Sequence, residues 1–283
     1  MFSPFFNQIL PIVIIYNQKI KTSDTILTLN SELQKLNIRM TIFIYDNSQI
    51  LDIDNKVDRF ENLDIIYHHD KDNGGLSAGY NMGAKLATEL KKTWILLLDQ
   101  DTTFKNLLES FNFNIQRYPN IHLFAPIVKL NNNVIFSPSI VKHKRGYPPK
   151  TISPGIYSLN NFSPINSGML IALKLFYEVG GYNEKIKVDF CDFQFIEKVY
   201  VKNPLFVVVD SVAIQDFSAF EPSVEKQLKR FNIYLNDVHN CYKPSIYDKF
   251  GFFYTVTRHT LGLTYKLKSH KFIIIYIKKY LFY

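Results

Sequence analysis

The chain has 283 residues, of which 47% are hydrophobic, so it can bury a substantial core and a disordered chain is excluded. Its two cysteines, Cys191 and Cys241, are too few for a disulfide framework and lack a metal-binding spacing, so a reducing cytoplasm is expected. The net charge of +8 lies almost wholly in residues 249–283, which hold seven basic residues and no acidic one.

The N-terminal stretch MFSPFFNQILPIVIIYNQ is apolar but has no basic start and no evident cleavage site, so we interpret residues 9–15 as a core strand and not as a signal peptide. No apolar run reaches the ~18 residues that span a bilayer. Hydrophobic periodicity then predicts strand 10–16, a helix capped by Ser23 or Asp24 and ending at Leu36, strands 39–45 and 63–67, helix 78–90 and strand 94–98. This alternation predicts an α/β fold with a mostly parallel central sheet and flanking helices.

The last of these strands, residues 94–98 (WILLL), is apolar throughout, which is typical of a central strand covered on both faces. It ends in Asp99-Gln100-Asp101, whose two carboxylates point to the same side in extended backbone. Because two such carboxylates repel each other unless a cation lies between them, the pair predicts a site for Mg or Mn. The alternative is that both aspartates are turn or capping residues.

Polar residues follow the other strands as well. Open α/β sheets bind ligands beyond the carboxyl ends of their strands, so these residues are candidates for a binding site. The residues expected at this edge are Asn17, Asp46, Asn73, Asp99 and Asp101. For Asp46 and Asn47 an Asx-turn is the alternative.

The second half of the chain is harder to interpret. The elements expected there are helix 106–118, strand 121–125, short strands and turns over 127–162, and a strand after Asn166-Ser167-Gly168. The cluster Lys142-His143-Lys144-Arg145 is either a solvated loop or a site for an anionic acceptor. Asp189 and Asp192 follow Gly180-Gly181-Tyr182 and are either catalytic or simply first-turn residues of a helix.

The order and spacing of Asn73-Gly74-Gly75, Ala78, Asn81, Gly83 and Asp99-Gln100-Asp101 resemble the nucleotide-sugar half of the family 2 glycosyltransferases, which have the GT-A fold. The likeness is greatest to the rhamnosyltransferase-like branch, in which DQD often replaces the more general DxD. It covers roughly residues 9–237. The resemblance implies a GT-A domain over residues 1–240, with a nucleotide-sugar-binding half, 1–125, and an acceptor-binding half, 126–240.

The resemblance implies an inverting, metal-dependent transfer of a sugar, rhamnose in the nearest branch, from a nucleotide-diphosphate sugar. The acceptor would be a saccharide or lipid-linked saccharide in the synthesis of a cell-surface polysaccharide such as capsule or O-antigen. Asp192, with Asp189 next in line, would be the catalytic base, and Asp101 with Asp99 would hold Mg or Mn. The residues implied to bind the nucleotide sugar are Tyr16, Asn17, Asp46, Asn47, Asn73, Gly74, Gly75, Asn81, Asp99, Gln100 and Arg230. For Arg230 an ordinary surface charge is the alternative.

The sequence departs from the family pattern at Lys187, Gln194 and Gln215. Gln215 stands where the pattern has His, which weakens the case for an ordinary metal site if that His takes part, and Asp216 is a candidate to compensate. A catalytically silent nucleotide-sugar-binding subunit is therefore one alternative. A nucleotidyltransferase with a similar sheet is another, but the glycine-rich basic loop expected near its first strand is missing from residues 15–21.

Residues 241–283 are expected to form a helical, basic and amphipathic tail. Its apolar residues are interrupted by lysines at intervals, which is typical of a helix in a membrane interface, and anionic headgroups would attract it. The alternative is a helix packed on the catalytic domain with its lysines outward. No nucleic-acid-binding motif accompanies the charge. The expected location is therefore cytoplasmic and peripheral, on the inner face of the cell membrane.

Overall fold

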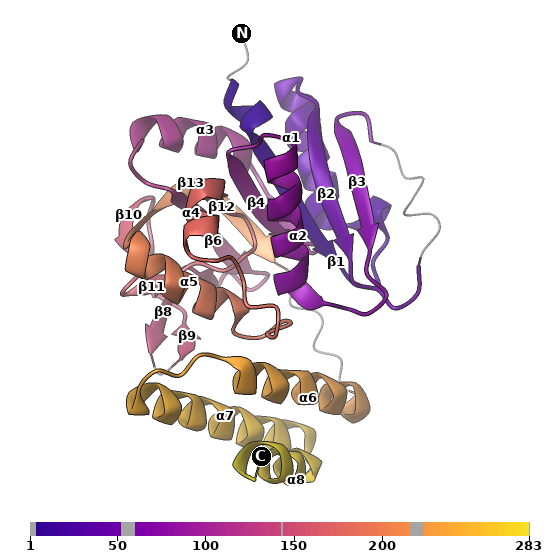
Figure 1. Ribbon diagram of the computed structural model, residues 1–283, viewed down its shortest axis with the longest axis vertical. Helices are drawn as coiled ribbons and strands as arrows, with labels where there is room; N and C mark the ends of the chain where they lie inside the picture. The colour runs from indigo at the N-terminus through magenta and orange to yellow at the C-terminus, as the bar shows by residue number, and fades with distance from the viewer. Residues whose placement is uncertain (1–3, 52–59, 143, 216–222, 283) are drawn as a thin grey trace.

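The computed structural model describes residues 4–51, 60–142, 144–215 and 223–282 (Figure 1). Its strands are β1 Ile9–Ile15, β2 Met40–Asp46, β3 Leu63–His69, β4 Trp94–Asp99, β5 Thr102–Phe104, β6 Leu123–Leu130, β7 Ile135–Ser137, β8 Ser139–Lys142, β9 Arg145–Tyr147, β10 Gly155–Ser158, β11 Phe162–Ser163, β12 Met169–Ala172 and β13 Leu205–Gln215. Its helices are α1 Asp24–Leu36, α2 Gly75–Glu89, α3 Leu107–Arg117, α4 Leu173–Glu178, α5 Cys191–Lys202, α6 Val224–Asn240, α7 Ile246–Leu267 and α8 Lys271–Tyr276, and a π-helical turn, Ile277–Leu281, follows α8.

A mixed sheet forms the centre of the molecule, in the order β10-β13-β6-β12-β4-β1-β2-β3, with β5 beside β13 and β7 beside β6. The N-terminal strands β4, β1, β2 and β3 are parallel to one another. The antiparallel strand β12 lies between β4 and β6, so the C-terminal half of the sheet is more mixed than the sequence suggests. The predicted α/β fold is confirmed, and the strands β11, β8 and β9 form a second, small sheet.

Two hydrophobic cores cover the two faces of the sheet. Every residue of β1 is buried, and its side chains alternate between the cores, with Leu10, Ile12 and Ile14 on one face and Ile9, Val13 and Ile15 on the other. Helices α1 and α3 contribute to the second core, and α2 and α5 to the first. A continuous apolar run therefore becomes a central strand because both of its faces are covered.

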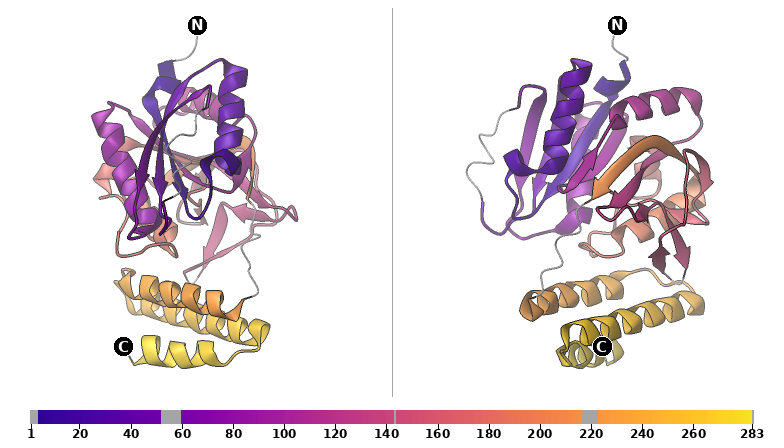
Figure 2. Two further views of the ribbon diagram at one scale, coloured as in Figure 1. Left: turned by 90° about the vertical axis from the view of Figure 1, so that its right-hand side faces the viewer. Right: turned by 180° about the vertical axis from the view of Figure 1, so that it is seen from behind.

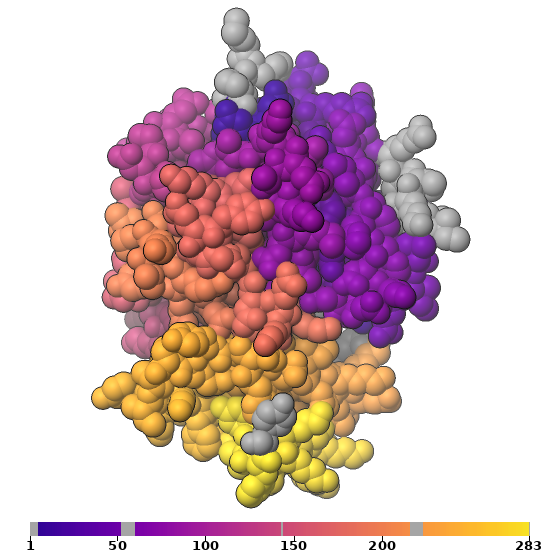
Figure 3. Space-filling view, viewed as in Figure 1, coloured from indigo at the N-terminus to yellow at the C-terminus, as the bar shows by residue number. Residues whose placement is uncertain are grey.

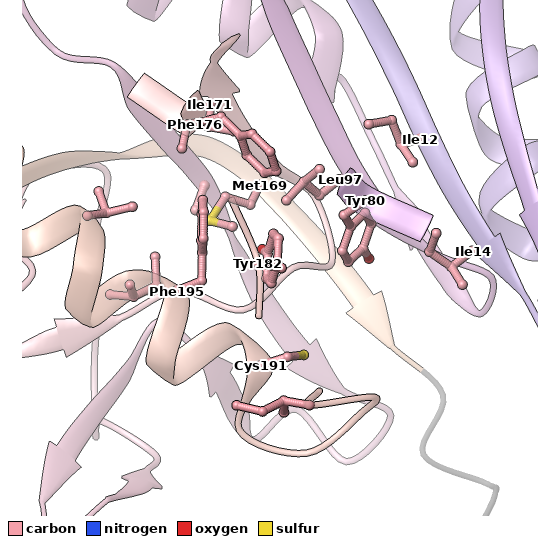
Figure 4. Packing of buried hydrophobic residues seen from close by; sticks show 14 of the residues in the cluster. Ile12, Ile14, Tyr80, Leu97, Met169, Ile171, Phe176, Tyr182, Cys191 and Phe195 are labelled. Carbon is pink, nitrogen blue, oxygen red and sulfur yellow. The ribbon is translucent and has the colours of Figure 1, made fainter. Parts of the chain in front are cut away.

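Helix α2 lies unusually close to β1, and two glycines one turn apart make this possible. A Cβ at Gly79 would come within 2.4 Å of Ile14 Cδ1, and a Cβ at Gly83 within 2.5 Å of Ile12 Cδ1. Figure 4 shows Ile12 and Ile14 of β1 beside Tyr80 of α2. Tyr80, between the two glycines, is fully buried and reaches the end of β4.

The helix starts are partly as predicted. Ser23 caps α1 by accepting a hydrogen bond from the backbone N–H of Ile26 (3.4 Å). Helix α2 starts at Gly75 and not at residue 78, and its N-cap residue Gly74 makes no side-chain cap. The hydroxyl of Ser77, inside the helix, instead donates to the carbonyl of Ile186 (2.5 Å), because a loop of the second half packs on this helix start.

Helices α6, α7 and α8 form a layer at one end of the molecule, opposite to α3 (Figures 1 and 2). Phe231 of α6 packs on Phe272 of α8, and Thr257 of α7 hydrogen-bonds Tyr276 of α8 (2.7 Å). The space-filling view shows this layer stacked against the rest of the protein (Figure 3). The layer already begins with α6, upstream of residue 241. Among the described residues, no helix has the length and apolar character needed to cross a membrane.

Replacing Gly83 tests the close packing of α2 on β1. The change Gly83→Val places methyl groups against the buried Ile12, and we expect the free energy of unfolding to fall by about 1–3 kcal/mol. The control is Gly262→Ala in α7, where a Cβ meets no atom within 4 Å, and which should stabilise by about 0.5–1 kcal/mol. Denaturant unfolding measures both, and an unchanged unfolding energy for Gly83→Val would contradict the packing.

Candidate active site

A cavity of about 580 Å³ lies where the two halves of the protein meet. Figure 1 shows β2 and β3 ending toward the side of the helical layer, so polar residues at their carboxyl ends face this part of the molecule. Four of the predicted site residues line the cavity: Asp99, Asp189, Asp192 and Arg230. Its other charged and amide-bearing lining residues are Arg145, Asn166 and Gln215.

Asp99 is held at the end of β4 by residues from three other parts of the chain. Its Oδ1 accepts a hydrogen bond from the hydroxyl of Tyr80 (3.0 Å), and its Oδ2 accepts one from the hydroxyl of Ser167 (2.5 Å). Burial raises the pKa of Asp99, although these hydrogen bonds oppose the shift. The predicted turn at residues 166–168 therefore supplies a partner for the carboxylate.

Gln215, the last residue of β13, connects the two carboxylates of the DQD motif. Its Nε2 lies 3.4 Å from Asp99 Oδ2 and 3.3 Å from Asp101 Oδ1, so the amide donates to both. The side chain is 7% exposed, and its Oε1 is buried with no hydrogen-bond partner among the residues that the structure describes. An amide donor at this position offsets the repulsion between the two carboxylates. The sequence had led us to expect a cation in this role.

The same three side chains would suit a divalent cation once the amide of Gln215 is turned over, which brings Oε1 to the carboxylates in place of Nε2. Two carboxylates and one amide oxygen are hard oxygen ligands of the type that Mg²⁺ accepts, usually together with waters and substrate phosphates. The Oε1 of Gln215 would be the third oxygen ligand, in addition to the two aspartates. The described residues include no group of three His, Cys, Asp or Glu side chains arranged for a metal. Asp216, the candidate to compensate for the missing His, lies outside the described residues.

Asp192 is the first-turn carboxylate of α5 and faces the cavity. Removal from water raises its pKa to about 7, and the negative charges of Asp99 and Asp189 add to the shift, while the backbone N–H of Phe193 opposes it. A carboxylate with a pKa near neutrality is suited to accept a proton, because it is partly deprotonated at working pH and still basic. The aromatic rings of Tyr182 and Phe195 stack behind this helix start, as Figure 4 shows.

Asp189 is paired with a basic side chain and is not a second isolated carboxylate. Arg230 of α6 donates to both of its oxygens, with one contact at 2.8 Å. This pairing keeps Asp189 engaged at the cavity wall, and it leaves Asp192 as the carboxylate on this side without an ion-pair partner among the described residues. Arg230 remains in the cavity lining, so part of its guanidinium is available to the cavity.

The loop that carries Asp189 is fixed by a buried carboxylate that sequence reasoning did not assign to the site. Asp237 of α6 is fully buried, and it accepts hydrogen bonds from the backbone N–H groups of Lys187, Val188 and Asp189, each at 2.9 Å. Burial raises the pKa of Asp237, and the three N–H donors counteract that rise. The available signal was an aspartate seven residues after Arg230, which is two turns along the same helix face.

Apart from Asp99 and Arg230, the residues predicted to bind the nucleotide sugar do not line the cavity. Tyr16, Asn17, Asp46 and Asn47 lie at the carboxyl ends of β1 and β2. The N–H of Tyr16 donates to Gln100 Oε1 (2.7 Å), and that of Asn17 to Ser48 Oγ (2.8 Å). Asp46 makes the Asx-turn that was the alternative, with Oδ1 accepting from the N–H of Ser48 (2.9 Å), and its Oδ2 accepts from Tyr67 (2.6 Å). A role of Asp46 at the base or ribose stays a prediction.

The glycine pair and its neighbours connect the two halves. The N–H of Gly75 donates to Asn47 Oδ1 (3.1 Å), and a Cβ at Gly75 would lie 2.4 Å from the carbonyl oxygen of Lys187. The ammonium group of Lys187 donates to the carbonyl of Asn73 (2.7 Å). The N–H of Gly74 donates to Asp70 Oδ2 (2.6 Å).

Asn81 is likewise engaged between the halves. Its amide exchanges hydrogen bonds with the backbone of Tyr182 and donates to Glu184 Oε1 (2.9 Å). The geometry gives Asn81 a role in joining α2 to the second half of the chain.

Comparisons with known proteins agree with this architecture. No family model matches the chain, and no curated protein matches it in sequence. Among solved structures, GalNAc-T7 with UDP, GalNAc and Mn²⁺ is similar with a TM-score of 0.59 at 13% identity, over 82% of this chain and 47% of that one. Residues 1–349 of Staphylococcus aureus TarS with UDP give a TM-score of 0.54 at 17% identity, over 82% and 65% of the two chains.

The same TarS fragment without ligand gives a TM-score of 0.53 at 17% identity, over 83% of this chain and 81% of that one. This chain spans about half the length of the GalNAc-T7 structure and about two thirds of the UDP-bound TarS structure. These neighbours are GT-A glycosyltransferases, and at such low identities the likeness shows the fold alone. The predicted GT-A fold is thereby confirmed.

The raised pKa of Asp192 predicts a pH-dependent stability. Between its ordinary value of 3.8 and about 7, the folded protein retains a proton that the unfolded chain releases. The contribution of Asp192 to the free energy of unfolding should therefore fall as pH rises through that window, by at most about 1.4 kcal/mol per pH unit. The amide introduced by Asp192→Asn cannot ionise, so the unfolding free energies of the native chain and the variant should converge or cross as pH increases. Parallel pH curves for the two proteins would contradict the shift.

Proposed function

We propose that this protein is a glycosyltransferase that moves a sugar from a nucleotide-diphosphate sugar to a hydroxyl group of an acceptor, with inversion at the anomeric carbon. The observation that carries the proposal is the shared cavity, in which the carboxylate at the end of β4 stands with Asp192 of α5. The GT-A fold supports it, because the solved neighbours include complexes with UDP and UDP-GlcNAc. Rhamnose as the donor sugar rests only on the likeness of the DQD motif.

Asp192 acts as the general base in this proposal. The acceptor hydroxyl attacks the anomeric carbon from the side opposite the nucleotide, and a carboxylate within hydrogen-bond reach must take its proton. Asp192 has the raised pKa that this task requires, and Asp189 with its arginine partner lies beside it at the cavity wall. The hydrogen bonds of Asp237 to the backbone of residues 187–189 keep this wall in place.

Asp101, Asp99 and the amide oxygen of Gln215 are the residues that would hold Mg²⁺ or Mn²⁺. A bound divalent cation neutralises the charge that develops on the leaving diphosphate. The GalNAc-T7 neighbour was solved with Mn²⁺. Arg230 lines the same cavity and is paired with Asp189 at its wall.

Turnover with a panel of donors tests the proposal. The panel should contain dTDP-rhamnose, UDP-GlcNAc and other UDP- and GDP-sugars, with Mg²⁺ or Mn²⁺. Activity with one donor should fall by about 100-fold or more in Asp101→Ala and in Asp192→Asn. It should remain in Asp210→Asn, a matched control at an exposed aspartate of β13. The kcat/KM of the native enzyme should rise with pH through about 7, as Asp192 loses its proton.

The amide bridge of Gln215 favours one other function, a catalytically silent nucleotide-sugar-binding subunit. In that case the amide would take the place of the cation between the two carboxylates. Binding of a nucleotide diphosphate without added metal, and without turnover of any donor, would select this alternative. Activity that survives Asp192→Asn would instead assign the base to another residue, with Asp189 first in line.

The metal affinity itself tests whether the amide oxygen of Gln215 is a ligand of the cation. With UDP present, Gln215→Glu should bind Mg²⁺ about 10-fold more tightly, because a carboxylate replaces the amide oxygen as the third ligand. Gln215→Leu should weaken binding by a similar factor. Gln34→Glu on the exposed face of α1 is the control. Calorimetric titration gives the affinities directly, and identical values in all four proteins would exclude Gln215 from the cation site.

The proposed acceptor is a saccharide or a lipid-linked saccharide, and the proposed location is the cytoplasm at the inner face of the cell membrane. The basic residues of the C-terminal helices support this location. The cavity also has a cation at its acceptor side, Arg145 of β9, which lies over the ring of Tyr147. A positive side chain there suits an acceptor that carries phosphate.

A further inference from the structure

One side of α7 is apolar and largely aromatic, yet faces solvent. Its residues follow each other at intervals of three, four or seven positions, which places them on one face of the helix. They are Tyr247, Phe250, Tyr254, Leu261 and Tyr265, with exposed fractions of 85%, 68%, 44%, 55% and 88%. A helix that only packs on the catalytic domain buries its apolar face, whereas α7 has a second apolar face left over.

The end of the chain repeats this arrangement. Ile274, Ile277 and Leu281 are spaced by three and four residues, and their exposed fractions are 43%, 38% and 46%. The opposite side of this segment packs inward, since Phe272 contacts Phe231 of α6 and Tyr276 contacts Thr257 of α7. The aliphatic stripe of α8 and the π-helical turn after it is therefore an outer face of the same helical layer.

Every lysine and arginine of residues 249–282 is exposed: Lys249, Arg258, Lys266, Lys268, Lys271, Lys278 and Lys279. No acidic residue follows Asp248 in the chain. Asp248 itself is neutralised by an ion pair with Lys144 (2.8 Å). The outer surface of α7 and α8 thus combines apolar side chains with a net positive charge.

We propose that the outer faces of α7 and α8 form a docking surface for an anionic lipid bilayer. Tyrosine and phenylalanine rings insert at the level of the headgroups, and lysine side chains bury their methylene stems while their ammonium groups meet lipid phosphates. A second copy of the chain fits this surface less well, because a symmetric contact would place seven basic residues opposite the same seven.

The docking surface lies on the layer whose inner side holds the active-site wall. Arg230 and Asp237 of α6 contact residues 187–189, which border the cavity. A bilayer bound to α7 and α8 would therefore lie close to the acceptor side of the cavity. This inference deepens the proposed function. It rests on that function only where it assumes a lipid-linked acceptor.

Co-sedimentation of the full chain with lipid vesicles tests the proposal. One set consists of phosphatidylcholine alone, and in the other phosphatidylglycerol makes up about a third of the lipid. The native chain should bind the anionic set at least about 10-fold more tightly, and added salt should weaken this binding.

Two groups of substitutions separate the apolar from the electrostatic contribution. Replacing Tyr247, Phe250 and Tyr265 together by Ser should weaken binding about 10-fold or more. Replacing Lys266, Lys268 and Lys271 together by Gln should weaken it by about 100-fold. The matched controls are Phe113→Ser on exposed α3 and the joint change of Lys35, Lys85 and Lys105 to Gln, all exposed positions away from the helical layer. Both controls should bind as the native chain does.

The proposal is overturned if the native chain does not bind vesicles, or if it binds both vesicle sets equally. It is also overturned if both groups of substituted chains bind as tightly as the native chain. A dimer in solution that the aromatic substitutions dissociate, combined with no vesicle binding, would assign the face to a second copy and likewise overturn it. Donor turnover with a water-soluble acceptor is measured alongside and should be unchanged in all these variants. Vesicle binding without turnover would therefore refute the proposed function and leave the docking surface standing.

Discussion

The carboxylate of Asp99 is the constraint around which the two halves of this protein are joined. A strand buried on both faces places a charged group where water is scarce, so the protein must supply hydrogen bonds to it. The donors come from α2, from the turn before β12 and from the end of β13, through Tyr80, Ser167 and Gln215. Segments that are distant in sequence are thereby brought to the same point at the carboxyl edge of the sheet.

A second buried carboxylate performs the same task on the other side of the cavity. Asp237 gathers three consecutive backbone N–H groups, and Arg230 pairs with the aspartate that ends this loop. Both residues belong to α6, so this wall of the cavity depends on a helix that comes after the sheet is complete. The raised pKa of Asp192 follows from this construction, because the wall encloses the carboxylate and places two other aspartates near it.

Much of the N-terminal half could be predicted from the sequence, since its signals are local. Continuous apolar runs identify β1 and β4, Ser23 marks the start of α1, and the DQD motif marks the end of a central strand. The start of α2 was missed because a contact more than a hundred residues away, from Ser77 to the carbonyl of Ile186, fixes the first turn. The short strands between β6 and β12 carry too little periodicity to be placed.

The partners of the site residues were the least predictable feature. The family resemblance implied that Arg230 contacts the nucleotide sugar and that Asp189 is second in line for the catalytic base, but it did not indicate their pairing, which joins residues 41 positions apart. The bridge from Gln215 to both carboxylates spans more than a hundred positions. Such contacts follow from how the halves pack together, which no short motif encodes.

Helix α6 packs between the loop at residues 187–189 on one side and helices α7 and α8 on the other. Its inner side contacts the carboxylate of Asp189 and the backbone of residues 187–189, whereas α7 and α8, which cover its other side, present their outer residues to the surroundings. The outer residues are therefore free to be exchanged without disturbing the chemistry. Under the proposed docking, a few changed side chains on this outer face would redirect the protein to another cellular surface. Loss of α6 would instead remove the groups that hold Asp189 and the loop before it.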